Sequence, residues 1–183
     1  MKTLAPIPCR KFRLLVVDDQ PLLRSGVTQF INQQEDMMIC GEADSIDSTR
    51  VAVRDLTPDL LILALLLGGG DVIELIKTFK IEFPSMGVLV FSQVEEILFA
   101  TRALRAGAVG YVSKQESPDE VLLAIRTVLG GGTYVSREVA VHVLREQLEQ
   151  SGQVETESVP KVGNLSDREL HVFRLIGTGF STR

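Results

Sequence analysis

Short apolar runs alternate with amphipathic stretches from residue 14 to residue 130, and this alternation constrains the fold more than any other feature of the sequence. The apolar runs predict β-strands at residues 14–17, 37–40, 60–67, 88–91 and 111–112. The first, third and fourth runs are apolar almost throughout, which is typical of strands that are buried on both faces of a parallel sheet.

The stretches between these runs carry apolar side chains at helical spacing. Helices are predicted after Pro21, from a Ser45 cap to about Leu56, over residues 71–83 and 95–106, and from a capping box at residues 117–120. Gly107 and Gly130 are expected to end the last two helices. Five β-α units in succession predict an α/β fold, in which helices cover both faces of an open, doubly wound parallel sheet.

Composition limits the class of protein. The chain has 183 residues and a net charge of −5, so as a whole it is not a basic nucleic-acid-binding protein. The cysteines, Cys9 and Cys40, lack metal-ligand spacing, and we expect Cys40 to be a small buried apolar side chain. The N-terminus lacks the core of a signal peptide, and residues 60–67 are too few to span a bilayer. We therefore expect a cytoplasmic protein with no membrane partner.

Polar side chains follow three of the predicted strands. Asp18 and Asp19 follow the first strand, Ser92 follows the fourth, and Lys114 lies just after the fifth. The carboxyl ends of parallel strands share one edge of the sheet, where sites form in open α/β folds. Paired carboxylates suit Mg²⁺, and a hydroxyl and an ammonium suit phosphoryl oxygens. The alternative is that the acids are a helix cap and a solvated side chain.

The segments VVDDQPLLRSG, PDLLILALLL, VLVFSQ and AGAVGYVSKQ resemble the receiver domains of bacterial two-component response regulators over about residues 11–130. The resemblance implies a (βα)5 CheY-like, flavodoxin-like fold. It also implies paired acids that hold Mg²⁺, a third-strand aspartate that accepts a phosphoryl group from a histidine kinase, and a hydroxyl and a lysine that sense it. Asp18, Asp19, Ser92 and Lys114 match those positions. Tyr111 matches the switch aromatic, although it is equally well explained as an ordinary half-buried strand residue.

The family pattern is broken at the third strand, where Ala64 occupies the phosphoacceptor position. A methyl group has no nucleophilic oxygen, so we expect no phosphoryl transfer there, no catalytic residue and no phosphorylation by a histidine kinase. Leu66 and Gly68 also depart from the family pattern, which favours natural divergence over an engineered knock-out. We expect a weak or vestigial Mg²⁺ site at Asp18 and Asp19, and no other cofactor.

Two smaller predictions concern the same edge of the sheet. We expect Lys114 to pair with Asp18 or Asp19 in a partly exposed ion pair that contributes roughly 0–1 kcal/mol. The glycines at residues 68–70 are interpreted as a flexible turn, because they lack the lysine and hydroxyl residue of a phosphate-binding loop.

The C-terminal part divides into a predicted linker, residues 132–164 with a helix over 136–150, and a fragment, residues 165–183. LSDRELHVFRLIGTGFSTR resembles the start of the helix-turn-helix domain of NarL/LuxR-type regulators, and GGGTYVSREVA resembles the segment that follows their receivers. From residue 161 onward the net charge is +2, and the recognition helix is absent. We expect a full-length parent to bind DNA, but not this chain to bind it tightly.

The leading hypothesis is therefore a transcriptional regulator with an atypical receiver at residues 11–131. The alternative is a protein-interaction or dimerisation module that never contacts DNA. An enzyme, such as a phosphatase with Asp18 as its nucleophile, is disfavoured because the resemblance explains the acids without it. A homodimer through the receiver is plausible, either on the fourth helix and fifth strand or on the first and fifth helices.

Overall fold

Five parallel strands form one sheet in the computed structural model, which describes residues 10–68, 70–93, 97–137 and 139–142. The strands are β1 (Phe12–Val17), β2 (Met37–Ala43), β3 (Leu60–Leu63), β4 (Gly87–Ser92) and β5 (Gly110–Ser113). Their order across the sheet is β2-β1-β3-β4-β5. This is the predicted doubly wound α/β architecture, so the fold class is confirmed.

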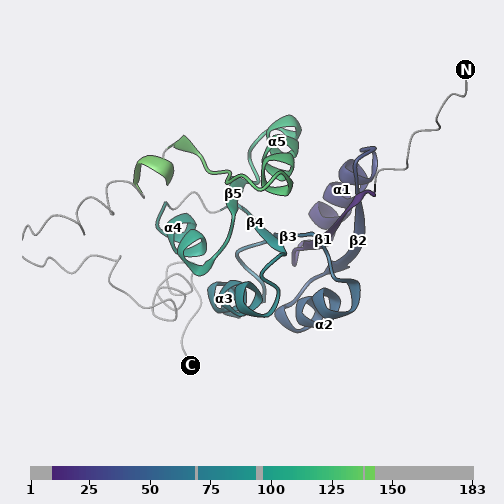
Figure 1. The fold of residues 1–183 in the computed structure, drawn as a ribbon, viewed down its shortest axis with the longest axis horizontal. Helices are drawn as coiled ribbons and strands as arrows, with labels where there is room; N and C mark the ends of the chain where they lie inside the picture. The colour runs from purple at the N-terminus through teal and green to yellow at the C-terminus, as the bar shows by residue number, and fades with distance from the viewer. Residues whose placement is uncertain (1–9, 69, 94–96, 138, 143–183) are drawn as a thin grey trace, which may run out of the picture.

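Helices cover both faces of this sheet (Figure 1). They are α1 (Pro21–Asn32), α2 (Ile46–Leu56), α3 (Val72–Glu82), α4 (Ile97–Ala106) and α5 (Pro118–Leu129). Two apolar clusters fill the spaces between the layers. The α2–α4 cluster takes its helical members from α2, α3 and α4, and the α1/α5 cluster takes them from α1 and α5. The chain is thus a three-layer sandwich with one apolar core on each side of the sheet.

The central strands are apolar throughout because they are buried on both faces of the sheet. In β1, Leu15 and Val17 belong to the α2–α4 cluster, while Leu14 and Val16 belong to the α1/α5 cluster. Successive side chains of a strand point to opposite faces, and both faces are covered here. The prediction of two-sided burial is therefore confirmed.

Local side chains determine where several helices begin. The Ser45 hydroxyl accepts a hydrogen bond from the Ser48 amide at 3.3 Å, and the Ser48 hydroxyl accepts one from the Ser45 amide at 3.1 Å. At α5, the Ser117 hydroxyl accepts a hydrogen bond from the Glu120 amide at 3.2 Å. These side chains satisfy amide groups that the helix itself leaves without partners. The predicted caps at Ser45 and Ser117 are confirmed.

Two predictions about the strands were wrong in detail. The apolar run at residues 60–67 is not all strand, because β3 ends at Leu63. Leu65 and Leu67 are buried in the loop, so their apolar character reflects packing rather than sheet pairing. Cys40 is only partly buried, because β2 is an edge strand; its partial burial still raises the pKa of its thiol.

The predicted linker helix at residues 136–150 is described only at its start, where residues 137 and 139–142 are helical. The remainder of that helix, the predicted linker up to residue 164 and the fragment at residues 165–183 lie outside the described residues. Within the described part of the chain, no helix has the length and apolar character required to cross a membrane.

Candidate functional site

Asp18 is the first residue after β1, and its side chain is only 1% exposed. Its amide donates a hydrogen bond to the Ala43 carbonyl at 3.1 Å, and its own carbonyl accepts one from Arg24 at 2.5 Å. The carboxylate oxygen Oδ1 accepts a hydrogen bond from the Gln20 amide at 2.9 Å. Backbone and side-chain contacts therefore hold the Asp18 carboxylate in one orientation at the edge of the sheet.

The Lys114 ammonium completes this arrangement. Its nitrogen Nζ lies 2.5 Å from Asp18 Oδ2, and the Lys114 side chain is 6% exposed. The contact is an ion pair without hydrogen-bond alignment, so Oδ2 accepts no hydrogen bond among the described residues. Nζ also lies 5.9 Å from the centroid of the Phe91 ring, within the range of a cation–π contact. The expected partly exposed pair is in fact buried.

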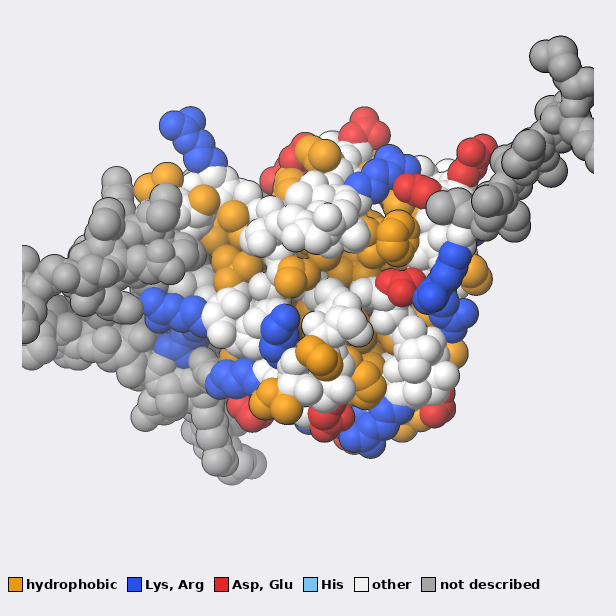
Figure 2. Space-filling view, viewed as in Figure 1, with side chains coloured by type: hydrophobic (Ala, Val, Ile, Leu, Met, Phe, Trp, Pro, Cys, Tyr) orange, Lys and Arg blue, Asp and Glu red, His pale blue; other side chains and the backbone are white. Residues whose placement is uncertain are grey.

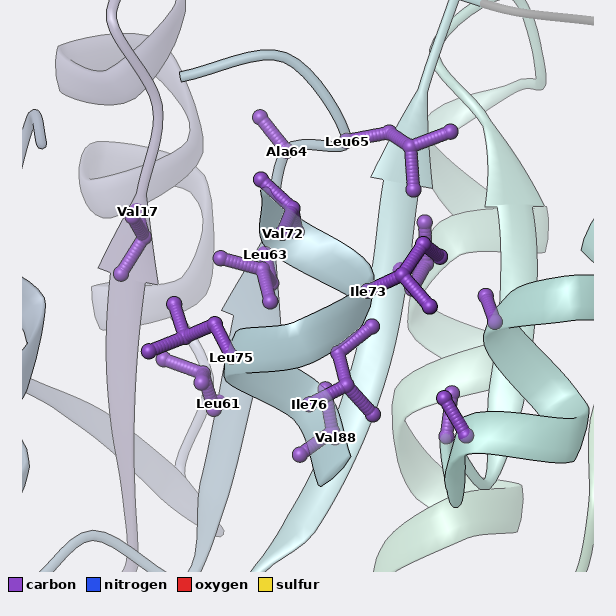
Figure 3. Packing of buried hydrophobic residues seen from close by; sticks show 14 of the residues in the cluster. Val17, Leu61, Leu63, Ala64, Leu65, Val72, Ile73, Leu75, Ile76 and Val88 are labelled. Carbon is purple, nitrogen blue, oxygen red and sulfur yellow. The ribbon is translucent and has the colours of Figure 1, made fainter. Parts of the chain in front are cut away.

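Ala64 follows β3 at the same edge of the sheet. Its amide donates a hydrogen bond to the Val17 carbonyl at 2.9 Å, so it lies beside the residue that precedes Asp18. Figure 3 shows Ala64 and Leu65 at the carboxyl end of β3, and Val72 of α3 belongs to the same apolar cluster as Ala64. Ala64 is 3% exposed and belongs to the α2–α4 cluster. Its surroundings are therefore those of an apolar core residue.

Ser92 and Tyr111 lie on the neighbouring strands, as predicted. Ser92 ends β4, is buried, and accepts a hydrogen bond from the Lys114 amide through its carbonyl at 2.9 Å. Tyr111 is buried on β5, opposite Val90 of β4. The sheet thus places Asp18, Ala64, Ser92 and Lys114 at one edge, where Asp18 and Lys114 form an ion pair.

Other residues singled out in the sequence stay at the surface. Asp19 is exposed, and Leu66 is an exposed apolar side chain in the loop after β3. Gly68 adopts a φ of +48°, in the left-handed region that glycine enters without strain. Proline cannot adopt this conformation, because its ring fixes φ near −65°. The resemblance to receiver domains implies a proline at this position, and the backbone of the loop after β3 would not permit one.

Arg24 is a site residue that sequence analysis missed. Besides its bond to the Asp18 carbonyl, it forms an ion pair with Glu42 of β2 at 3.0 Å. Thr28 of α1 donates a hydrogen bond to the same Glu42 carboxylate at 2.7 Å. No local pattern connects Arg24 with Glu42, because the sheet register alone brings β2 beside the start of α1.

In this arrangement the Asp18 carboxylate is not open to a resident Mg²⁺ ion. Magnesium is held through carboxylate oxygens together with several waters in near-octahedral geometry. Both oxygens of Asp18 already face donors, the Gln20 amide and the Lys114 ammonium. Within the described ranges, no three His, Cys, Asp or Glu side chains are gathered closely enough to hold a metal ion.

Comparisons with known proteins agree with this geometry. Residues 14–126 match the model of the response regulator receiver domain. The chain is 30% identical over 174 residues to the oxygen regulatory protein NreC of Staphylococcus aureus strain JH9, which covers 93% of this chain and 79% of NreC.

Two solved structures are similar in fold. A LuxR-family two-component response regulator from Aurantimonas sp. SI85-9A1 is 29% identical, with a TM-score of 0.70, covering 76% of this chain and all of the other. RcsB from Salmonella enterica serovar Typhimurium, solved bound to promoter P1flhDC with the phosphomimetic BeF3−, is 24% identical, with a TM-score of 0.69, covering 94% of this chain and 80% of RcsB. This chain belongs to the response regulators of the NarL/LuxR type, and the folded unit described above contains their receiver domain.

Proposed function

We propose that this protein is a transcriptional regulator whose receiver works without phosphorylation. The observation that carries the proposal is the buried methyl group of Ala64 at the end of β3, where the family resemblance places the phosphoacceptor carboxylate. Alanine offers no nucleophilic oxygen to a phosphoryl donor. A histidine kinase would therefore find no acceptor at this position.

The surrounding residues support the same proposal. Lys114, which matches the phosphate-sensing lysine, is engaged by Asp18 in a buried ion pair. The ion pair thereby neutralises the Asp18 carboxylate, which would otherwise be a metal ligand. We therefore expect at most weak Mg²⁺ binding and no required cofactor. Gly68 gives the loop after β3 a left-handed backbone. The strand-end site has therefore diverged both at Ala64 and in the loop after β3, while Asp18, Asp19, Ser92 and Lys114 still match the family positions.

A signal other than phosphate would then control the receiver. Leu66 is 41% exposed in the loop beside the strand ends, and Leu65 and Leu67 on either side of it are buried. Burial of the Leu66 side chain against an apolar surface would be favourable, which is compatible with a protein partner or a small apolar ligand at this loop. We propose that such an occupant takes the part that the phosphoryl group plays in other receivers.

DNA binding is proposed for the full-length regulator, acting as a homodimer in the cytoplasm. RcsB, a structural relative, is solved bound to a promoter, and residues 165–183 resemble the start of a helix-turn-helix domain. In Figure 2, acidic and basic side chains are interspersed around one face of the receiver, and no patch of a single charge dominates this view. We therefore assign DNA contacts to the C-terminal part of the protein.

Intact-mass measurement with a small-molecule phosphodonor and Mg²⁺ tests the proposal. The protein is expected to keep its mass, whereas a phosphorylatable receiver treated alongside gains a phosphoryl group. The variant Ala64→Asp supplies the missing carboxylate and shows whether the rest of the site still supports transfer. A stable phospho-adduct on the unsubstituted receiver would overturn the proposal.

A further inference from the structure

Three hydrogen bonds fix the turn that carries Asp18. The Asp18 amide bonds to the Ala43 carbonyl of β2 at 3.1 Å, and the Asp18 carbonyl accepts a charge-assisted bond from Arg24 at 2.5 Å. The carboxylate oxygen Oδ1 accepts the Gln20 amide at 2.9 Å, a local bond that is typical of aspartate in a turn. Because its amide, carbonyl and Oδ1 are all engaged, Asp18 presents Oδ2 to the Lys114 ammonium.

Arg24 is itself held by β2. It belongs to α1, which Figure 1 shows beside β1 and β2. Its Nε donates a hydrogen bond to Glu42 Oε2 at 3.0 Å, and the other oxygen of Glu42 accepts the Thr28 hydroxyl at 2.7 Å. The Arg24 side chain is 16% exposed and that of Glu42 is 36% exposed. β2 therefore holds Asp18 twice, directly through Ala43 and indirectly through Arg24.

The planar guanidinium of Arg24 suits this bridging position. Its Nε faces the Glu42 carboxylate while Nη1 faces the Asp18 carbonyl, so one rigid group joins a side chain to the main chain. That carbonyl belongs to the peptide between Asp18 and Asp19, and rotation of this peptide would change the directions of both side chains. In the observed orientation the Asp18 carboxylate is buried and Asp19 is exposed. Arg24 thus holds the peptide that separates the two acids.

We propose that Arg24 is a positioning residue of the strand-end site, which selects Asp18 rather than Asp19 as the partner of Lys114. It acts through the main chain of Asp18. By fixing the Asp18 carbonyl, Arg24 keeps Oδ2 directed at the ammonium and keeps Lys114 engaged. The engagement of Lys114, which follows β5, therefore depends on a contact with β2, the strand at the opposite edge of the sheet.

Double-mutant cycles on the full chain test the role of Arg24. Urea denaturation with Asp18→Asn and Lys114→Met measures the coupling of these two residues, first with Arg24 present and then in the Arg24→Gln background. We expect Arg24→Gln to lower this coupling at least about fivefold, expressed as a ratio of unfolding equilibrium constants. A residue that only stabilises the fold would weaken every protein of the cycle alike. An unchanged coupling would therefore overturn the proposal.

A second cycle, with Asp19→Asn in place of Asp18→Asn, measures the selection between the two acids. With Arg24 present, we expect Lys114 to couple to Asp18 and not to the exposed Asp19. In the Arg24→Gln background the difference between the two couplings should narrow, and an unchanged difference would contradict the selection. The cycles contain no phosphodonor and no Mg²⁺, so their outcome is independent of whether the receiver can be phosphorylated.

Arg54→Gln is the matched control. Arg54 of α2 pairs with Glu82 of α3 at 3.3 Å, and Glu82 is 39% exposed, close to the value for Glu42. This change is expected to leave the coupling of Asp18 with Lys114 as it is, and a loss equal to that in Arg24→Gln would contradict a specific role for Arg24. Glu42→Gln is the milder test if Arg24→Gln does not fold. It keeps the guanidinium but removes its anchoring charge, so the coupling should fall by about threefold, and an unchanged coupling would also overturn the proposal.

Discussion

At the scale of single residues, the ion pair between Asp18 and Lys114 dominates the site. Both side chains are almost fully buried, so each has lost its hydration. A buried pair adds little net stability over apolar side chains, but removal of one partner leaves an uncompensated charge. The pair therefore makes the strand-end site sensitive to substitution of either residue. It also engages the Lys114 ammonium, which is then not free to bind an anion such as a phosphoryl group.

Lys114→Met should destabilise the receiver by about 3–5 kcal/mol, because the Asp18 carboxylate then stays buried without a cation. Urea denaturation of the wild type, Lys114→Met, Asp18→Asn and the double variant measures this cost. Lys114→Met is expected to cost much less in the Asp18→Asn background, with a coupling energy of about 1–3 kcal/mol. Equal costs in the two backgrounds would show that the pair is not coupled in solution.

At the scale of elements, local chemistry accounts for the helix starts better than for the strand ends. The capping box at Ser45 can be recognised in the sequence, because its hydrogen bonds join residues three apart. The end of β3 cannot be recognised in this way. The apolar run continues to Leu67, and burial against the α2–α4 cluster favours leucine in a loop as strongly as in a strand.

Ser45→Ala should reduce the free energy of unfolding by about 1 kcal/mol, because the first turn of α2 loses its side-chain acceptor. The matched control is Ser25→Ala, in the middle of α1, where the serine is exposed. That change is expected to be neutral or slightly stabilising, because alanine has the higher helix propensity. Thermal and urea denaturation compare the two variants, and an equal effect at both positions would argue against the cap.

At the scale of the whole molecule, ion pairs join segments that are distant in the sequence. Arg126 of α5 binds Asp36, which precedes β2, at 3.0 Å. Both side chains are about half exposed, so solvent and salt weaken the pair. The hydrogen bond from Arg126 lowers the pKa of Asp36. The pair therefore links protonation of one carboxylate to the docking of α5 beside the turn that follows α1.

The contribution of Asp36 should depend on pH with a definite sign. Its pKa is lower in the folded state, so the stabilisation is present above the unfolded value of about 3.9 and is lost as pH falls through the folded pKa. Asp36→Asn should therefore weaken the protein slightly at pH 7 and have no effect in strong acid. Glu35→Gln, at an exposed neighbouring carboxylate, is the control. An NMR titration in which Arg126→Gln leaves the pKa of Asp36 unchanged would contradict this link.

The sequence by itself determined the alternation of strands and helices, two of the helix caps and the placement of polar side chains at one edge of the sheet. These features follow from side-chain periodicity and from bonds between residues close in the chain, and parallel topology brings the strand ends together. Ala64 is likewise visible in the sequence, and a side chain without oxygen has the same chemical limits in any fold.

Only the tertiary structure decided which of the two adjacent aspartates forms the ion pair with Lys114. The turn after β1 buries Asp18 and leaves Asp19 in solvent, although the two residues are adjacent. The same holds for the contact of Arg24 with Glu42 and for the docking of Tyr134 on β5. These contacts join residues far apart in the chain, so they depend on sheet register and helix packing, which no local pattern of residues encodes.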